Sequence, residues 1–189
     1  MLGCLAVYGA LDLGSKEWAL DNLSRARATE PPPVCVPDAH GGVVYQRVAL
    51  ASRPLVPGVL RLLYAENCGA AFSMLRTAPA WVRAFVFGIA AVGASIMLLI
   101  MFVRGVGGRL FAAAVPFVLA GAWGNLVDRV RHGFVVDFLQ VDPALFVYPV
   151  FNVADIVIVI GAGLLLIDGL VKQRSGGAKS ELARGHSAS

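Results

Sequence analysis

Residues 84–103 read AFVFGIAAVGASIMLLIMFV, a run of 20 residues without a charge between Arg83 and Arg104. At about 1.5 Å per residue, a helix of this length spans the hydrocarbon core of a bilayer, which is about 30 Å thick. The composition of the whole chain agrees with a membrane protein. Of its 189 residues, 58% are hydrophobic and only 15% are charged, whereas soluble domains carry about 25% charged residues.

Three more apolar segments complete a set of four expected spans, with both ends of the chain on one side of the membrane. The expected spans are 1–20, 84–103, 110–130 and 150–170. We therefore predict an all-α membrane protein with four transmembrane helices in a single domain over 1–172, followed by a disordered cytoplasmic tail over 173–189. The tail and the short loop 104–109 are rich in Lys and Arg, which indicates the cytoplasmic side.

The region 21–79 differs from the spans because it is rich in Pro and Gly, and its first half reads as loops. Val59–Tyr64 is strand-like, so we expect a small extracytoplasmic β-rich platform. Two of the three cysteines, Cys35 and Cys68, fall in this region and could pair, although an odd cysteine count does not decide the matter.

Charge and metal-ligand patterns narrow the possible partners. The net charge of +4 and a pI near 9.3 come from scattered basic residues, which does not predict nucleic-acid binding. The His and Cys residues show none of the spacings that predict a metal site. We expect no cofactor and no nucleic-acid partner.

Two carboxylates in otherwise apolar surroundings are the strongest functional signal. A charge in hydrocarbon is costly, so an intramembrane carboxylate is a candidate functional group. Asp155 lies about five residues, or about 8 Å, below the outer start of span 150–170, and Asp137 lies in the preceding connector, 131–148. Both are therefore expected near the outer membrane face, within reach of water and of each other.

Two carboxyl groups that share one proton can perform acid–base chemistry on an amide bond. The ionised group removes a proton from water, and the protonated group supplies one to the substrate. The proton affinities of such groups belong to the pair. A Ser-Lys dyad, with Lys16 near Ser15 or Ser73, is less well supported by its spacing.

Other polar residues could position the pair. Asn125 precedes Asp128 by three residues, and Asn152 stands in the same relation to Asp155. We predict a charge-assisted pair of Asp128 with Arg129 that holds the connector, which makes Asp128 an orienting residue.

Two further groups of residues have an ordinary structural alternative. Asp12 and Lys16 are four residues apart on a helix, so they could be no more than a local ion pair. The stretch from Asn67 to Ser73 contains Gly69, which permits a tight turn, and that turn could be no more than the edge of a strand.

Five sequence blocks, taken in order, resemble lipoprotein signal peptidase, the bacterial signal peptidase II family. The blocks are Leu11-Asp12 with Lys16, Asn67-x-Gly69-Ala70-Ala71-Phe72-Ser73, Gly124-Asn125-x-x-Asp128-Arg129, Gly133-x-Val135-Val136-Asp137-Phe138, and Phe151-Asn152-x-Ala154-Asp155. The resemblance covers Leu11 to Leu170. Two features depart from the family pattern: the Pro-rich stretch Arg25–Pro57 is longer, and Cys68 occupies a position where a small polar residue is common.

The resemblance implies an aspartic endopeptidase of the bacterial cytoplasmic (inner) membrane, with its active site near the outer face. Such enzymes remove signal peptides from prolipoproteins by cleaving before a diacylglyceryl-modified cysteine, need no cofactor, and are inhibited by globomycin. By motif, Asp137 and Asp155 match the catalytic pair. Residues matching those that line or support the site are Asp12, Lys16, Asn67, Gly69, Asn125, Arg129, Asn152 and Ala154. We expect a monomer in contact with membrane lipids.

Two functions of other classes use the same residues. A small transporter or proton-coupled channel would use the aspartates as a relay, but they cluster at one face and no internal repeat is visible. A lipid-binding scaffold without activity would not need the intact pair.

Overall fold

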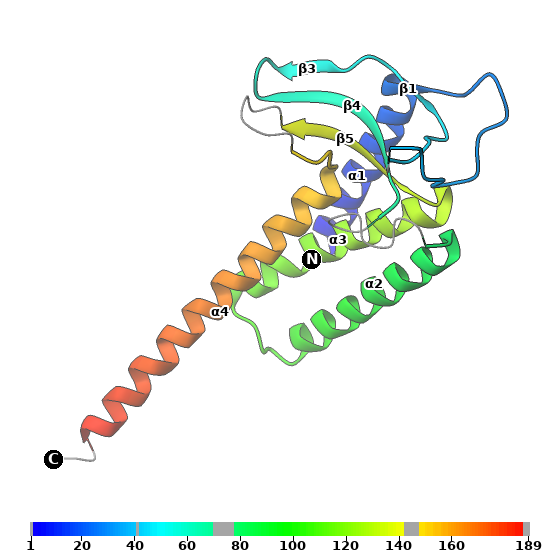
Figure 1. Ribbon diagram of the computed structural model, residues 1–189. Coiled ribbons are helices and arrows are strands. Elements are labelled where there is room, and N and C mark those ends of the chain that lie inside the picture. Colours follow the sequence, from blue (N-terminus) through cyan, green and yellow to red (C-terminus); the bar gives the residue numbers. More distant parts are fainter. Residues whose placement is uncertain (1, 41, 70–77, 142–147, 187–189) are drawn as a thin grey trace.

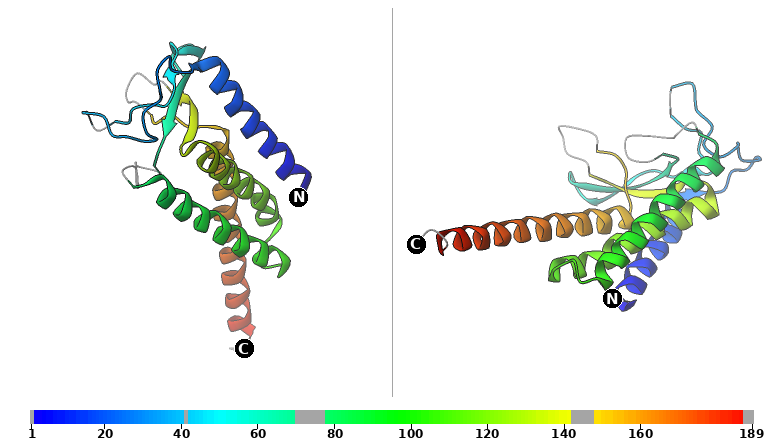
Figure 2. Two further views of the ribbon diagram at one scale, coloured as in Figure 1. Left: turned by 90° about the vertical axis from the view of Figure 1, so that its right-hand side faces the viewer. Right: turned by 90° about the horizontal axis from the view of Figure 1, so that it is seen from below.

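The computed structural model describes residues 2–40, 42–69, 78–141 and 148–186, within which the chain forms four long helices and short antiparallel strands (Figure 1). The helices are α1 (Leu2–Leu23), α2 (Ala80–Val103), α3 (Arg109–His132) and α4 (Val153–His186), and the strands are β1 (Ser24–Arg25), β2 (Val48–Ala49), β3 (Arg53–Val56), β4 (Leu60–Asn67) and β5 (Val135–Val141). The strands gather at one end of the helices (Figures 1 and 2).

Helix α3 is the centre of the helical part, where it packs against α1, α2 and α4. Helices α2, α3 and α4 are long and apolar enough to cross a membrane. Half of the apolar window of α3 is buried inside the protein, against 17% for α2 and 22% for α4. The structure therefore confirms helices over the three later expected spans, with α3 as the shared packing partner.

The expected first span is present as a helix, but its composition does not mark it as a span. Residues 1–20 do form a helix, α1, but it is not among the helices apolar enough to be counted as a span within the described chain. Its sequence includes Asp12, Lys16, Glu17 and Asp21, which lower its hydropathy. Length and composition alone thus support three spans. Helix α1, which carries these charged residues, packs beside α3 and α4.

The expected strand over Val59–Tyr64 is confirmed as part of β4, the middle strand of a sheet ordered β3-β4-β5. Within the expected connector 131–148, Val135–Val141 form the strand β5. Strand β5 pairs with β4 so that Asp137 lies opposite Ala65. The run Val135–Val141 is buried on both faces for most of its length, so it lacks the alternation that marks a half-buried strand.

A disulfide between Cys35 and Cys68 ties the loop before β2 to the end of β4. Both cysteines are buried in the core beneath the sheet, together with Leu23, Tyr64 and Phe138. The pairing that the sequence left open is thus present in the structure.

The C-terminal end differs from the expected disordered tail over 173–189, because α4 continues to His186. Residues 178–184 are mainly Ala, Lys, Glu, Leu and Arg, which have high helix propensity. Once a helix exists, each added residue contributes a hydrogen bond without a new nucleation step. The backbone therefore extends past the apolar part of α4.

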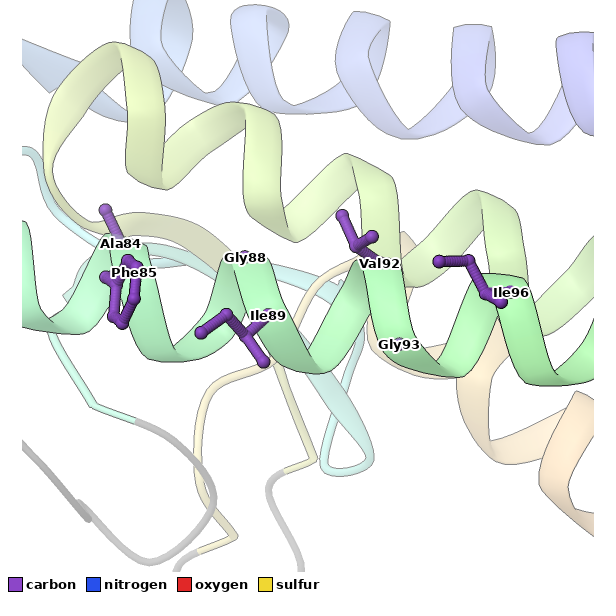
Figure 3. Close-up of a pocket in the computed structure, with 7 residues that line it drawn as sticks. All are labelled: Ala84, Phe85, Gly88, Ile89, Val92, Gly93 and Ile96. Carbon is purple, nitrogen blue, oxygen red and sulfur yellow. The ribbon is translucent and has the colours of Figure 1, made fainter.

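One flank of α2 forms a shallow apolar groove that no other described element covers. Figure 3 shows that the residues lining it all belong to this helix: Ala84, Phe85, Gly88, Ile89, Val92, Gly93 and Ile96. Phe85, Ile89 and Ile96 are each more than half exposed. Such a surface is suited to contact with lipid chains.

Helices α3 and α4 approach so closely that side chains are excluded at the contact. A Cβ at Gly121 would lie 2.5 Å from the carbonyl oxygen of Ala154 and 3.0 Å from the side chain of Val157. At Gly163 of α4, by contrast, a Cβ would meet nothing within 4 Å. Close backbone contact of this kind is a common way to pack membrane helices.

We predict that Gly121→Ala lowers the thermal unfolding midpoint of the purified protein in detergent, because the added methyl group collides with backbone and α3 must move away from α4. Overpacking of this kind costs about 1–3 kcal/mol. The matched control Gly163→Ala should leave the midpoint unchanged or raise it, since Ala favours helix over Gly. Equal midpoints for the two variants would contradict the close contact.

Candidate active site

The residues singled out in the sequence converge where the sheet meets the C-terminal end of α3 and the N-terminal end of α4. The structure places Asp12 and Lys16 on α1, Asn67 at the end of β4 with Gly69 just after it, Asn125, Asp128 and Arg129 on α3, Asp137 on β5, and Asn152, Ala154 and Asp155 at the start of α4. Ala70, Ala71, Phe72 and Ser73 of the second block lie outside the described residues.

Asn152 joins the two aspartates. Its side-chain Nδ2 donates to Asp137 Oδ1 at 2.6 Å, and its backbone N–H donates to Asp155 Oδ2 at 3.2 Å. One residue thus holds both carboxylates, and Asn152 is itself fully buried. Asp137 and Asp155 are therefore brought to one place, although 18 positions separate them in the sequence.

The start of α4 fixes the orientation of Asn152. Its Oδ1 accepts the N–H of Asp155 at 3.0 Å, while Asp155 Oδ2 accepts the N–H of Asn152. This reciprocal arrangement is a capping box, which satisfies two backbone N–H groups. Because a backbone N–H can only donate, Asn152 must turn its oxygen toward it and its NH₂ toward Asp137.

Helix α1 also contributes to the start of α4. The N–H of Ala154 donates to Asp12 Oδ1 at 2.8 Å. A Cβ at Gly124 would overlap the other oxygen of Asp12, so glycine leaves the space that this carboxylate occupies between α3 and α4. A side chain on α1 therefore caps α4.

The second oxygen of Asp137 is held from β4. Asn67 Nδ2 donates to Asp137 Oδ2 at 2.9 Å. Asn67 is oriented in turn by the N–H of Gly69, which donates to Asn67 Oδ1 at 3.1 Å. Both oxygens of Asp137 thus receive an amide N–H, one from Asn67 and one from Asn152.

Lys16 orients the amide that contacts Asp155. Its Nζ lies 2.9 Å from Asn125 Oδ1 and pairs with Asp12 at 2.8 Å and Asp128 at 3.3 Å. An ammonium group can only donate, so Asn125 must present its oxygen to Lys16, and its Nδ2 donates to Asp155 Oδ1 at 2.9 Å. Lys16 is only 2% exposed, so these contacts replace its hydration.

The prediction that Asp128 forms an ion pair with Arg129 is wrong. Asp128 pairs with Lys16, and its Oδ2 accepts the N–H of Val136 at 3.0 Å, next to Asp137 on β5. Consecutive residues of a helix point in different directions, so Asp128 and Arg129 do not face each other. Asp128 holds β5 directly.

Arg129 instead connects three elements around the site. Its guanidinium donates to the carbonyl oxygens of Asn125 at 3.1 Å and Gly69 at 2.9 Å. It also lies over the ring of Phe87 on α2, 4.0 Å from the ring centroid, in a cation–π contact. Arg129 thus fastens the end of β4 to α3 and α2.

The two aspartates differ in their environment. Asp137 is only 2% exposed, whereas Asp155 is half-buried. Burial, together with the charge of Asp155, raises the pKa of Asp137 to about 7, although hydrogen bonds from Asn67 and Asn152 and the charge of Lys16 oppose this rise. Two neighbouring carboxyl groups with different surroundings can act as acid and base.

Sequence reasoning missed two features of the site. In the sequence, Asn152 is followed three residues later by Asp155 at the start of an apolar run, which is a pattern that predicts a capping box. The contact of Lys16 with Asn125 joins residues 109 positions apart, and no local pattern shows it. Over the described part of the chain, no group of three His, Cys, Asp or Glu residues is arranged to hold a metal ion.

Comparison with known sequences finds relatives along most of the chain. A lipoprotein signal peptidase from Serratia proteamaculans is 34% identical over 180 residues, covering 95% of this chain and 92% of the relative. A lipoprotein signal peptidase from Photorhabdus laumondii is 43% identical over 171 residues, covering 90% and 87%.

Solved structures show the same fold. A bacterial membrane enzyme determined at 2.3 Å resolution superposes with a TM-score of 0.68 at 24% identity and covers 93% of this chain and 89% of its own. A second, determined at 1.9 Å, gives a TM-score of 0.63 at 23% identity and covers 88% and 89%. The family model for signal peptidase (SPase) II matches residues 4–171. With relatives and a family model spanning nearly its whole length, this chain belongs to the signal peptidase II family and is a peptidase.

Proposed function

We propose that this chain is an aspartic endopeptidase that removes signal peptides from prolipoproteins, with Asp137 and Asp155 as its catalytic pair. Family membership supports prolipoproteins as the substrate class. The observation that carries the assignment of the pair is the position of Asn152, which donates to one oxygen of each carboxylate. A carboxylate pair held in this way has its proton-accepting and proton-donating groups set before the substrate arrives.

The unequal burial of the pair suggests the role of each member. Asp137, nearly sealed from water, holds the shared proton, and the more exposed Asp155 carries the negative charge. Asp155 removes a proton from a water molecule as its oxygen attacks the peptide carbonyl carbon, while Asp137 gives its proton to the carbonyl oxygen. When the C–N bond of this tetrahedral intermediate breaks, the proton taken up by Asp155 passes to the leaving amine. A hydroxyl group of the intermediate then returns its proton to Asp137 as the carbonyl group re-forms, which restores the starting state of the pair.

The surroundings of Asp137 support this division. The charged groups that act on it are Asp155 from α4, Lys16 from α1 and Arg129 from α3. Asp155 accepts hydrogen bonds from the Asn125 side chain and from the backbone N–H of Asn152. Lys16, Asp12, Asp128, Arg129, Asn67, Gly69 and Ala154 would act as positioning residues.

Two features of the structure support a placement in the membrane. We propose that α1 is a fourth transmembrane helix, because α3 and α4 cover its buried polar pair, Asp12 and Lys16. The sheet would form an extracytoplasmic platform, since a disulfide such as Cys35–Cys68 persists in an oxidising compartment. The site would then lie near the outer face of the bacterial inner membrane.

This placement also suggests how the substrate is presented. A diacylglyceryl-modified cysteine would keep its acyl chains in the bilayer while the peptide bond before it reaches the aspartates. We propose cleavage at that bond by a monomeric enzyme, and inhibition by globomycin-type cyclic peptides that occupy the same site.

Replacing either aspartate should stop the reaction. We predict that Asp137→Asn and Asp155→Asn each abolish cleavage of a diacylglyceryl prolipoprotein by the purified protein, followed as a mobility shift with and without globomycin. The amide keeps the shape but can neither accept a proton from water nor share one. Asp168→Asn is the matched control, because Asp168 is a buried α4 carboxylate that caps Gly108 and Phe111 at the far end of α3. Full activity in either dyad variant would contradict the assignment.

The pH profile should report the protonated member of the pair. Because the pKa of Asp137 is raised to about 7, its neutral form persists up to that pH and is lost above it. We predict that kcat/KM for prolipoprotein cleavage is retained just below about pH 7 and falls about tenfold per pH unit above it. A rate that keeps rising from pH 7 to 9 would show that a protonated Asp137 is not required.

Removing the positive charge from the centre of the site should affect stability and activity together. In Lys16→Met, the Asp12 and Asp128 carboxylates stay buried without their cation, which costs about 3–5 kcal/mol. Asn125 also loses one of the two donors that orient its oxygen, and only the 3.1 Å hydrogen bond from Asn152 Nδ2 remains. We predict that Lys16→Met has a lower thermal unfolding midpoint than the wild type and cleaves the prolipoprotein more slowly.

The matched control for this variant is Lys172→Met. Lys172 also pairs with an aspartate four residues away, Asp168, but its side chain is 47% exposed. Exposed pairs contribute only about 0–1 kcal/mol, so the control should remain near wild type. The role of Lys16 would be refuted by equal unfolding midpoints in the two variants.

A further inference from the structure

Asn67, which donates to Asp137, stands between two residues that attach the outer loop 26–47 to β4. On one side is Glu66, which binds the backbone of that loop, and on the other is Cys68, which is covalently joined to it through Cys35. The loop is therefore fastened to the sheet immediately before and immediately after a residue that touches the candidate dyad.

The first attachment is a buried carboxylate. Glu66 accepts the N–H of Gln46 at 2.8 Å and of Arg47 at 3.0 Å, and the hydroxyl of Tyr64 donates to it at 3.0 Å. Burial raises the pKa of Glu66, while these hydrogen bonds oppose the rise. This attachment is made of hydrogen bonds that can open and close.

The second attachment is covalent. Cys68 is flanked by Asn67, which donates to Asp137 Oδ2 at 2.9 Å, and by Gly69, whose N–H holds Asn67 and whose carbonyl oxygen accepts from Arg129. Cys35 and Cys68 are 5% and 4% exposed and belong to the core that contains Phe134, Val136 and Phe138. The bond therefore links Asn67 to the buried surface of β5, the strand that carries Asp137.

We propose that the Cys35–Cys68 disulfide is a positioning element of the peptidase, which holds the Asn67 amide against Asp137 and so sets the geometry of the dyad. The inference rests on the proposed function of Asp137. Opening the bond leaves this backbone restrained by the pairing of Asn67 with Val135 at the end of the ladder and by the hydrogen bond of Arg129 to Gly69. Cys68 itself lies beyond the last paired residue, so the Asn67 amide samples positions away from Asp137. Displacement of a positioning group by about 1 Å can lower a rate by about a hundredfold.

The test removes the bond in two independent ways. The background is Cys4→Ser, because Cys4 is exposed and lies away from the site, and a thiol titration then counts only Cys35 and Cys68. The bond is opened by dithiothreitol, which supplies two electrons and two protons and itself closes to a cyclic disulfide. It is removed genetically in the double variant Cys35→Ala/Cys68→Thr.

A double-mutant cycle with Asn67→Ala separates positioning from general stability. We expect no free thiol in the oxidised protein under denaturing conditions, and a loss of kcat of about tenfold when the bond is opened, with a smaller change in KM. In the Asn67→Ala background, opening the bond should change kcat by less than about twofold, because both changes remove the same contact. The alkaline limb of the kcat/KM profile should move to higher pH in both cases, since the Asn67 hydrogen bond lowers the pKa of Asp137.

Three results would overturn the positioning role: two free thiols in the protein as isolated, equal kcat for the oxidised and reduced forms, or the same loss of kcat in the Asn67→Ala background as in its parent. A different result would show that the proposed function itself is wrong. The oxidised parent would then not cleave the prolipoprotein at all, or would do so equally well as Asp137→Asn.

Discussion

The burial of Asp137 is the constraint on which the rest of the site depends. A carboxyl group sealed from water must have its oxygens satisfied by the protein, and here the donors are the amides of Asn67 and Asn152. Each amide presents its NH₂ to Asp137 because a fixed backbone N–H occupies its oxygen. This donor is the N–H of Gly69 for Asn67 and the N–H of Asp155 for Asn152. The end of β4 and the start of α4 therefore take their local geometry from one buried group.

The same logic extends to Asp155 through charged groups. Asn125 faces Asp155 because Lys16 occupies its oxygen, and Lys16 is buried only because Asp12 and Asp128 surround it. Asp12 also caps α4, and Asp128 binds the backbone of β5. Two structural carboxylates thus fix the backbones that carry the candidate catalytic ones. Charged side chains are costly in a membrane helix, but here Asp12, Lys16 and Asp128 connect α1, α3, α4 and β5.

The sequence was sufficient for the features governed by local rules. Apolar length predicted α2, α3 and most of α4, and helical rise placed Asp155 near the end of its span. The sequence was insufficient where the rotation of one helix relative to another decides the contact. Asp128 was assigned to Arg129, its neighbour in sequence, whereas helix geometry turns it toward Lys16. Both faces of strand β5 are buried, so the residues around Asp137 do not alternate between apolar and polar, and the sequence pattern predicts only a connector there.

We infer that Asp137 holds the single proton of the pair near neutral pH. Infrared difference spectroscopy of the purified protein, titrated from about pH 5 to 9, measures this protonation directly, because a protonated carboxyl group absorbs apart from a carboxylate. We expect a protonated carboxyl group that titrates with a midpoint of about 7 and is absent from Asp137→Asn but present in Asp168→Asn. A spectrum in which Asp137→Asn loses no protonated carboxyl band at pH 6 would contradict the assignment of the proton to Asp137.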